Sequence, residues 1–275
     1  MASIGKIPEA PRFRLERHQL AQVVCQVRFS PILTIQHDET VIPFQDSIRG
    51  EYPRYMKTAA LGIAVTPAGI QPQPLAHNLH RFQDTTGVYT AVLSQDFIAL
   101  ETTSYVDIED FAARIARLAA AVGEHFGPVE MTRIGLRFVN ELRLGSENPK
   151  HTMFEAITPA LLGPIGTEDL AAATLNMQQV FMLSGDGSNV LVRHGFSPEG
   201  GTTVELQPGQ QLDPRHAEPF YLLDIDAFIE ESKPFSVEGI EAHIRDFNDQ
   251  VRALFVWAVK PEFRKNALGQ VEVTA

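Results

Sequence analysis

The chain has 275 residues and a formal net charge of −11, with 44% hydrophobic and 21% charged side chains. This composition is typical of a folded protein with a sizeable core, so wholesale disorder is excluded. The acidic balance argues against broad binding to nucleic acids or anionic membranes, which call for a basic surface.

Cysteine content and apolar runs predict the compartment. The single cysteine, Cys25, excludes an intramolecular disulfide and fits a reducing environment. Neither the N-terminus nor any later segment has the apolar run of a signal peptide or a membrane span. We therefore expect a cytoplasmic protein whose proline- and charge-rich residues 1–19 form an extended arm.

Residues 20–144 predict a first α+β half. Leu20–Phe29 alternates as a strand, and a four-residue apolar spacing predicts a short helix within residues 41–52. Prolines make residues 58–78 irregular or edge-like. Short strands with polar turns follow, and then a helix that Asp107 caps and Gly127 ends.

The most informative stretch is residues 129–144, V-E-M-T-R-I-G-L-R-F-V-N-E-L-R-L. Alternation along a strand predicts one core-facing row, made of Ile134, Leu136 and Phe138. The other face then carries three guanidinium groups around one carboxylate, from Arg133, Arg137, Glu141 and Arg143.

Residues 145–173 show no clear period and predict a crossing segment, after which residues 174–275 form a second α+β half. Its expected strands are Thr174–Leu183, Asn189–Phe196, Thr202–Leu206 and Phe220–Phe228, and Ser236 caps a final amphipathic helix. Each half thus has an antiparallel meander followed by a long helix. We expect an α+β fold of two sheet-and-helix halves related by a weak pseudo-repeat, or one continuous domain.

The clustered arginines are the first candidate site. Arg28, Arg133 and Arg137 lie on strands that can be neighbours, where they could clamp a carboxylate or phosphate. The favoured alternative is a salt-bridge network with Glu141, Asp224 and Asp226.

The two aspartates are the second candidate. Asp224 and Asp226 project the same way from one strand, so they could hold a divalent cation or divide acid and base roles. Pairing with the arginines is the favoured interpretation. Neither a CxxC nor an HExxH occurs, and no nucleophile motif is present. We therefore expect no metal, no cofactor and no catalytic residue.

Three segments together resemble a sporadically distributed bacterial family of uncharacterised proteins of about this length. They are the strand Val23–Phe29, the central R-I-G-L-R-F-V-N from Arg133 to Asn140, and the D-I-D-A-F run at Asp224–Phe228 with its following helix. The resemblance spans nearly the whole chain. It implies no activity, cofactor or catalytic residue.

The first functional hypothesis is a non-enzymatic interaction protein that binds a protein partner or a regulatory ligand, with a homodimer through an exposed sheet edge as a further option. The second is an enzyme or sensor that holds a small anionic ligand between the two halves through Arg133 and Arg137. Nucleic-acid binding is a lesser alternative. The candidate ligand-binding residues are Arg28, Arg133, Arg137, Asn140, Asp224 and Asp226.

Overall fold

The structure is a computed structural model that describes residues 9–272 apart from 18, 67–68, 146, 186 and 203–213. Its strands are β1 (Phe13–Leu15), β2 (Leu20–Phe29), β3 (Arg54–Thr66), β4 (Gly69–Gln83), β5 (Tyr89–Ser94), β6 (Phe97–Thr102), β7 (Glu130–Arg143), β8 (Met177–Ser184), β9 (Asn189–Ser197), β10 (Phe220–Ile229), β11 (Lys233–Pro234) and β12 (Gln270–Glu272). Its helices are α1 (Asp38–Ile48), α2 (Ile108–Phe126), α3 (Pro149–Ala156), α4 (Glu168–Ala171), α5 (Val237–Ala258) and α6 (Pro261–Asn266).

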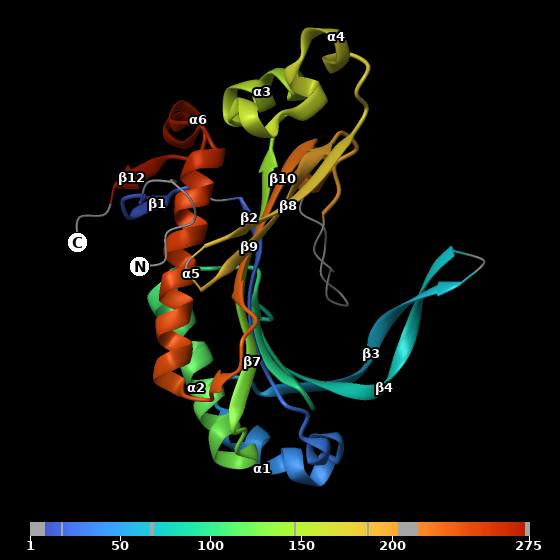
Figure 1. Cartoon of the computed structure of the whole chain (residues 1–275), viewed down its shortest axis with the longest axis vertical. Coiled ribbons are helices and arrows are strands. Elements are labelled where there is room, and N and C mark those ends of the chain that lie inside the picture. Colours follow the sequence, from blue (N-terminus) through green and yellow to red (C-terminus); the bar gives the residue numbers. More distant parts are fainter. Residues whose placement is uncertain are drawn as a thin grey trace. The chain divides into compact units, whose positions relative to one another are not determined.

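One large antiparallel sheet dominates the described chain (Figure 1). Its strand order is β3-β4-β5-β6-β2-β7-β10-β9-β8, with β11 paired to β7, while β1 and β12 form a separate two-stranded ribbon. The α+β class and the antiparallel sheet that the sequence predicts are therefore confirmed. The pseudo-repeat of two halves stays a prediction.

The chain divides into two compact units. Unit 1 comprises residues 1–23, 136–228 and 246–275, and unit 2 comprises residues 24–135 and 229–245. The strands β2 and β7 and the helix α5 each continue from one unit into the other. The expected boundary at residues 145–173 stays a prediction.

Unit 2 has its core around Phe44 of α1. The Phe44 ring lies 5.6 Å from that of Phe82 and 5.7 Å from that of Phe126, so helix and strand aromatics share one cluster. The side chain of Asp107 accepts the backbone N–H of Asp110 at the start of α2, and Gly127 ends the helix with φ 57°. A carboxylate cap and a left-handed glycine satisfy backbone groups that the helix leaves open at its two ends.

The proline-rich residues 58–78 are expected to be irregular or edge-like, and most of them belong to the β3–β4 hairpin, whose strand β3 is an edge of the described sheet (Figure 1). Pro72 and Pro74 pair with Ile63 and Leu61 of β3, whereas β5 pairs only with residues 80–83 of β4. The prolines thus lie where β4 has a partner on one side only. A missing N–H is tolerated there, since that edge carries no ladder.

Unit 1 contains the rest of β7, the meander β8–β9–β10 and the second half of α5. The predicted core residues of β7 are buried, with Leu136 at 0% and Phe138 at 6% exposed, but Val139 and Glu141 of the other row are buried as well, at 2% each. Residues 145–173 contain α3, α4 and two short 3-10 turns. The buried Arg264 of α6 donates to the carbonyls of Val256 and Val259, which lie at the end of α5.

Some expectations fall outside the part of the chain that the structure describes. The predicted strand Thr202–Leu206 is described only at its first residue, and residues 1–8 and 18 of the expected arm are likewise outside. Residues 13–15 of that arm form β1. No helix among the described residues is long and apolar enough to cross a membrane.

Candidate binding surface

Strand register in unit 1 brings charged side chains into one row. Val180 of β8 stands opposite Arg193 of β9, and Arg193 stands opposite Asp224 of β10. The neighbouring positions Phe181, Val192 and Ile225 face α5. Because side chains alternate between faces, Val180, Arg193 and Asp224 lie on the opposite side of the sheet, which we call the outer face.

Asp224 is the centre of this row. Arg137 of β7 donates from Nε to Oδ1 at 2.7 Å and from Nη2 to Oδ2 at 2.8 Å, a bidentate ion pair. Arg193 adds a bond from Nη1 to Oδ2 at 3.2 Å. The Asp224 side chain is 2% exposed, whereas those of Arg137 and Arg193 are 41% and 40% exposed. We call these three residues the arginine–aspartate row.

The row holds two arginines in fixed positions with part of each guanidinium facing solvent. The hydrogen bonds to Asp224 raise the pKa of Arg137 above its ordinary value, so the side chain stays charged. Within the described residues, Nη1 of Arg137 and the Nε and Nη2 of Arg193 make no hydrogen bond. Those donors can bind an anionic group without disturbing the bonds to Asp224.

Exposed apolar side chains flank the row. Val180 is 63% and Met182 is 62% exposed, and both belong to β8 on the outer face. Met182 stands opposite Leu191, which in turn stands opposite Asp226. On the outer face of unit 1, the exposed Val180 of β8 therefore lies beside the charged pair of Arg193 and Asp224. Met182 lies beside Leu191, and Asp226 follows on β10.

The other predicted site residues are placed as follows. Asn140 is 6% exposed, and its Nδ2 donates to the carbonyl of Leu223 at 3.0 Å, so its amide joins β7 to β10 inside the sheet. Asp226 is half-buried and adds to the negative charge that Arg137 experiences. Arg28 and Arg133 belong to unit 2. The structure thus brings together Arg137, Asn140, Asp224 and Asp226 in unit 1.

Arg28 and Arg133 have surroundings of their own. Arg28 is exposed, and its Nη2 lies 3.5 Å from Oδ2 of Asp96, a long surface contact. The Arg133 guanidinium folds back over Gly135, where its Nη1 lies 2.8 Å from the position that a Cβ of residue 135 would take. Gly135 thereby makes room for the arginine on the strand surface.

Arg193 is the functional candidate that sequence reasoning missed. It is the only Lys, Arg, Asp or Glu residue in β9, whose sequence is N-V-L-V-R-H-G-F-S. Aligning the alternation of β9 with that of β10 would have paired it with one of the two aspartates. Register alone decides which one, and it selects Asp224.

Glu141 and Arg143, near the end of β7, form a buried ion pair instead of a binding site. Arg143 donates to the carboxylate of Glu141 and, at 3.0 and 3.2 Å, to the carbonyls of Gly201 and Glu218. Both side chains are buried, at 8% and 3% exposed. The pair therefore holds the backbone on both sides of residues 203–213 against β7.

Two buried histidines complete the titratable groups of interest. His80 contacts the Tyr55 hydroxyl and the Ile35 carbonyl, both at 3.0 Å, and His194 contacts the Tyr221 hydroxyl at 2.7 Å. Burial lowers the pKa of both imidazoles. Among the described residues, no cluster of three or more His, Cys, Asp or Glu side chains could hold a metal ion.

Comparison with models of known protein families and with curated proteins finds no match for this chain. The resemblance to the bacterial family stays a prediction.

The buried histidines predict a pH dependence of stability. An unfolded histidine has a pKa of about 6.5, above that of either folded imidazole, so below this pH the unfolded state binds more protons. The free energy of unfolding should be constant above about pH 7 and should fall by up to about 1.4 kcal/mol per pH unit and per histidine below 6.5. Carboxylates titrate at lower pH and do not contribute in this window.

Urea unfolding at pH 7.5, 6.5 and 5.5 checks this expectation. The variant His151→Gln serves as control, because His151 is 63% exposed, and it should keep the wild-type slope. A free energy of unfolding that does not change between pH 7.5 and 5.5 contradicts the prediction.

Proposed function

We propose that this chain is a non-enzymatic binding protein that engages a protein partner through the outer face of unit 1. The observation that carries the proposal is the arginine–aspartate row beside two exposed apolar side chains. Binding sites in protein interfaces typically combine apolar contacts with a few arginines that carry much of the energy.

The geometry favours a binding role for Arg193 in particular. Asp224 already fixes the guanidinium groups, so less side-chain freedom is lost when a partner binds them. Arg193 makes one bond at 3.2 Å, and Asp224 keeps its bidentate pair with Arg137 when Arg193 is removed. Its removal should therefore affect binding more than folding.

Affinity capture with the tagged full-length chain tests the proposal. We expect a stoichiometric partner that binds wild type and binds Arg193→Ala at least about tenfold more weakly, as for an interface residue worth more than about 1.4 kcal/mol. Arg49→Ala is the matched control, since Arg49 is 70% exposed and forms only a 3.5 Å pair with Asp46 in unit 2. Equal recovery of the partner by both variants contradicts the proposal.

A small anionic ligand is the second candidate function. The unused donors of Arg137 and Arg193 favour it, because they can hold a carboxylate or phosphate at the row. A ligand bridging Arg133 and Arg137 is harder to fit, since positions four apart on a strand are separated by about 13 Å. A thermal-shift titration with inorganic phosphate and citrate should raise the melting temperature of wild type and not of Arg193→Ala, whereas no shift in either rejects this function.

We also propose that the fold contains two related series of elements. The series β2-α1-β3-β4-β5-β6-α2 and β7-α3-α4-β8-β9-β10-α5 both run from a long strand through a helical segment and a meander to a long helix. In the sheet order, β2 lies next to β6, the last strand of the first meander. Likewise, β7 lies next to β10, the last strand of the second meander. Homologous chains test this proposal, because duplicated halves keep matching apolar positions in α2 and α5 and unrelated halves do not.

A further inference from the structure

The strand β8 is an unprotected sheet edge. It is the last strand in the order of the described sheet, and its sequence M-Q-Q-V-F-M-L-S contains no charge, proline or glycine. Edge strands that remain unpaired usually carry such residues, because they block pairing with another chain. The strand at the other end, β3, carries Arg54 and Lys57.

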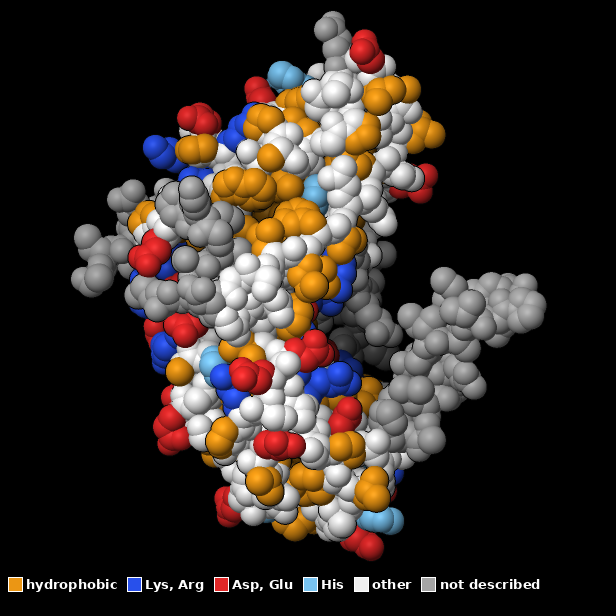
Figure 2. Space-filling view, viewed as in Figure 1, with side chains coloured by type: hydrophobic (Ala, Val, Ile, Leu, Met, Phe, Trp, Pro, Cys, Tyr) orange, Lys and Arg blue, Asp and Glu red, His pale blue; other side chains and the backbone are white. Residues whose placement is uncertain are grey.

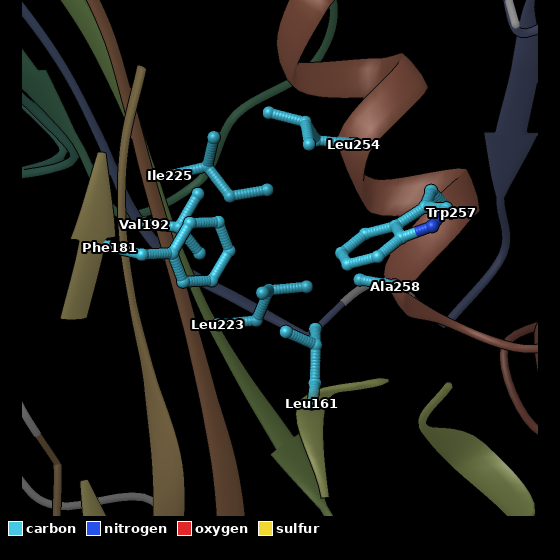
Figure 3. Close-up of a pocket in the computed structure, with 8 residues that line it drawn as sticks. All are labelled: Leu161, Phe181, Val192, Leu223, Ile225, Leu254, Trp257 and Ala258. Carbon is cyan, nitrogen blue, oxygen red and sulfur yellow. The ribbon is translucent and has the colours of Figure 1, made fainter. Parts of the chain in front are cut away.

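An apolar depression lies beside this edge. Phe181 of β8 and Trp257 of α5 point toward one another across this depression (Figure 3). Trp257 is 38% exposed, and every residue that lines the depression is apolar, namely Leu161, Phe181, Val192, Leu223, Ile225, Leu254, Trp257 and Ala258. Hydrophobic side chains gather over this region in the space-filling view (Figure 2).

Both faces of β8 thus present apolar surface next to a backbone edge that no other described strand pairs with. Val180 and Met182 stand on the outer face, and Phe181 faces the depression. A strand added to β8 would pair with the N–H and C=O groups on the side of β8 where the described residues place no strand. Its own side chains on the α5 side would then cover the depression.

We propose that β8 pairs antiparallel with β8 of a second copy of this chain, about a two-fold axis at Phe181. In an antiparallel pair, residues directly opposite one another share a face, so the axis must pass through a residue. An axis at Phe181 places Val180 opposite Met182 of the second copy, twice. It also places the Phe181 side chain of the second copy beside the depression. An axis at Val180 would instead set Met182 opposite the polar Gln178.

A second copy of this chain is the binding partner that best fits the β8 edge. A strand without charge has no electrostatic preference for a charged partner segment, whereas its apolar outer-face positions match themselves in the register described. The pairing also places two outer faces next to each other. The inference shares Val180 and Met182 with the proposed function but does not use Arg193, so the Arg193→Ala binding test distinguishes the two.

Charge substitutions test both the edge and the register. Val180→Lys or Met182→Glu places a single charge against an apolar side chain in each half of the paired strands, so each should weaken dimerisation at least about tenfold. The double variant Val180→Lys/Met182→Glu sets the introduced lysine of each copy opposite the introduced glutamate of the other. It should recover most of the lost affinity through these two cross-strand ion pairs.

Sedimentation equilibrium at up to about 100 μM protein measures the dimer dissociation constants of wild type, the two single variants and the double variant. Val106→Lys is the control, since Val106 is 69% exposed in unit 2 and should leave the dimer unchanged. Circular dichroism confirms that each variant is folded, as expected for side chains that are mostly in solvent. A monomeric wild type, a dimer insensitive to both single variants, or a double variant without recovery overturns the proposal. These outcomes leave the Arg193→Ala binding test unaffected.

Discussion

Replacing Arg137 with alanine is expected to lower the free energy of unfolding by about 3 kcal/mol. The change removes both hydrogen bonds of a bidentate pair. Among the described residues it leaves Asp224, which is 2% exposed, with only the 3.2 Å contact to Arg193. A buried carboxylate that loses its main partner typically costs about 3–5 kcal/mol. The loss of free energy of unfolding in Arg137→Ala should lie at the lower end of this range. The Arg137 side chain is 41% exposed, so water can reach the Asp224 carboxylate once that side chain is gone.

A second bidentate pair provides the control. Arg117 donates from Nε and Nη2 to Glu51, both at 2.8 Å, but the two side chains are 52% and 42% exposed. Arg117→Ala should therefore cost less than about 1 kcal/mol. Urea unfolding followed by circular dichroism compares the two variants. Equal losses would show that burial of Asp224 does not determine the strength of the pair.

This difference explains why Arg137 is a poor probe of binding and Arg193 a good one. Loss of a partner after Arg137→Ala could follow from unfolding alone. Arg193→Ala keeps the bidentate bond on Asp224, so a loss of partner binding without a loss of stability identifies a contact residue.

Local features of the fold could be predicted from the sequence because they depend on neighbouring residues. The carboxylate of Asp107 and the left-handed Gly127 mark the ends of α2, and alternation in β7 identifies its buried apolar row, Ile134, Leu136 and Phe138. Caps and periodicity act over a few residues and need no knowledge of the sheet order.

The arginine–aspartate row could not be assembled this way. Asp224 lies 87 residues from Arg137 and 31 from Arg193 along the chain, and strand order alone makes them neighbours. Asp226 shares the face of Asp224, yet on the β9 side register sets it opposite Leu191 and sets Asp224 opposite Arg193. Composition and alternation contain neither the order nor the register, so the two aspartates looked equivalent.

The prolines of residues 58–78 left two interpretations open, irregular or edge-like, for a related reason. The penalty for proline in a strand depends on whether its N–H side has a neighbour. Because β5 pairs with only the last residues of β4, Pro72 and Pro74 lie in a part of the hairpin that no third strand covers.

Replacing Gly195 with alanine should also cost about 3 kcal/mol, near the upper limit for inserting one methyl group into packed structure. An added Cβ would stand 2.0 Å from the carbonyl oxygen of Met177 and 3.0 Å from Cα of Gln178. These are backbone atoms of β8, so no rotation of a flexible side chain can relieve the clash. The φ of Gly195 is not positive, and the effect therefore arises from space alone.

Gly50→Ala is the matched control for this substitution. No atom lies within 4 Å of a Cβ at position 50, and its φ is not positive either. This variant should be neutral or slightly more stable, because alanine reduces the freedom of the unfolded chain. Urea unfolding of both variants and of wild type gives the comparison.

Because β8 is an edge strand, Gly195→Ala should act first by separating β8 from β9. Hydrogen exchange should then accelerate in residues 177–184 while the helix α2, in unit 2, remains protected. The same variant should abolish the proposed dimer, since a detached strand cannot present Val180, Phe181 and Met182 in register. Unchanged exchange in β8 would mean that β9 accommodates the methyl group without separating from its neighbour, and it would contradict this prediction.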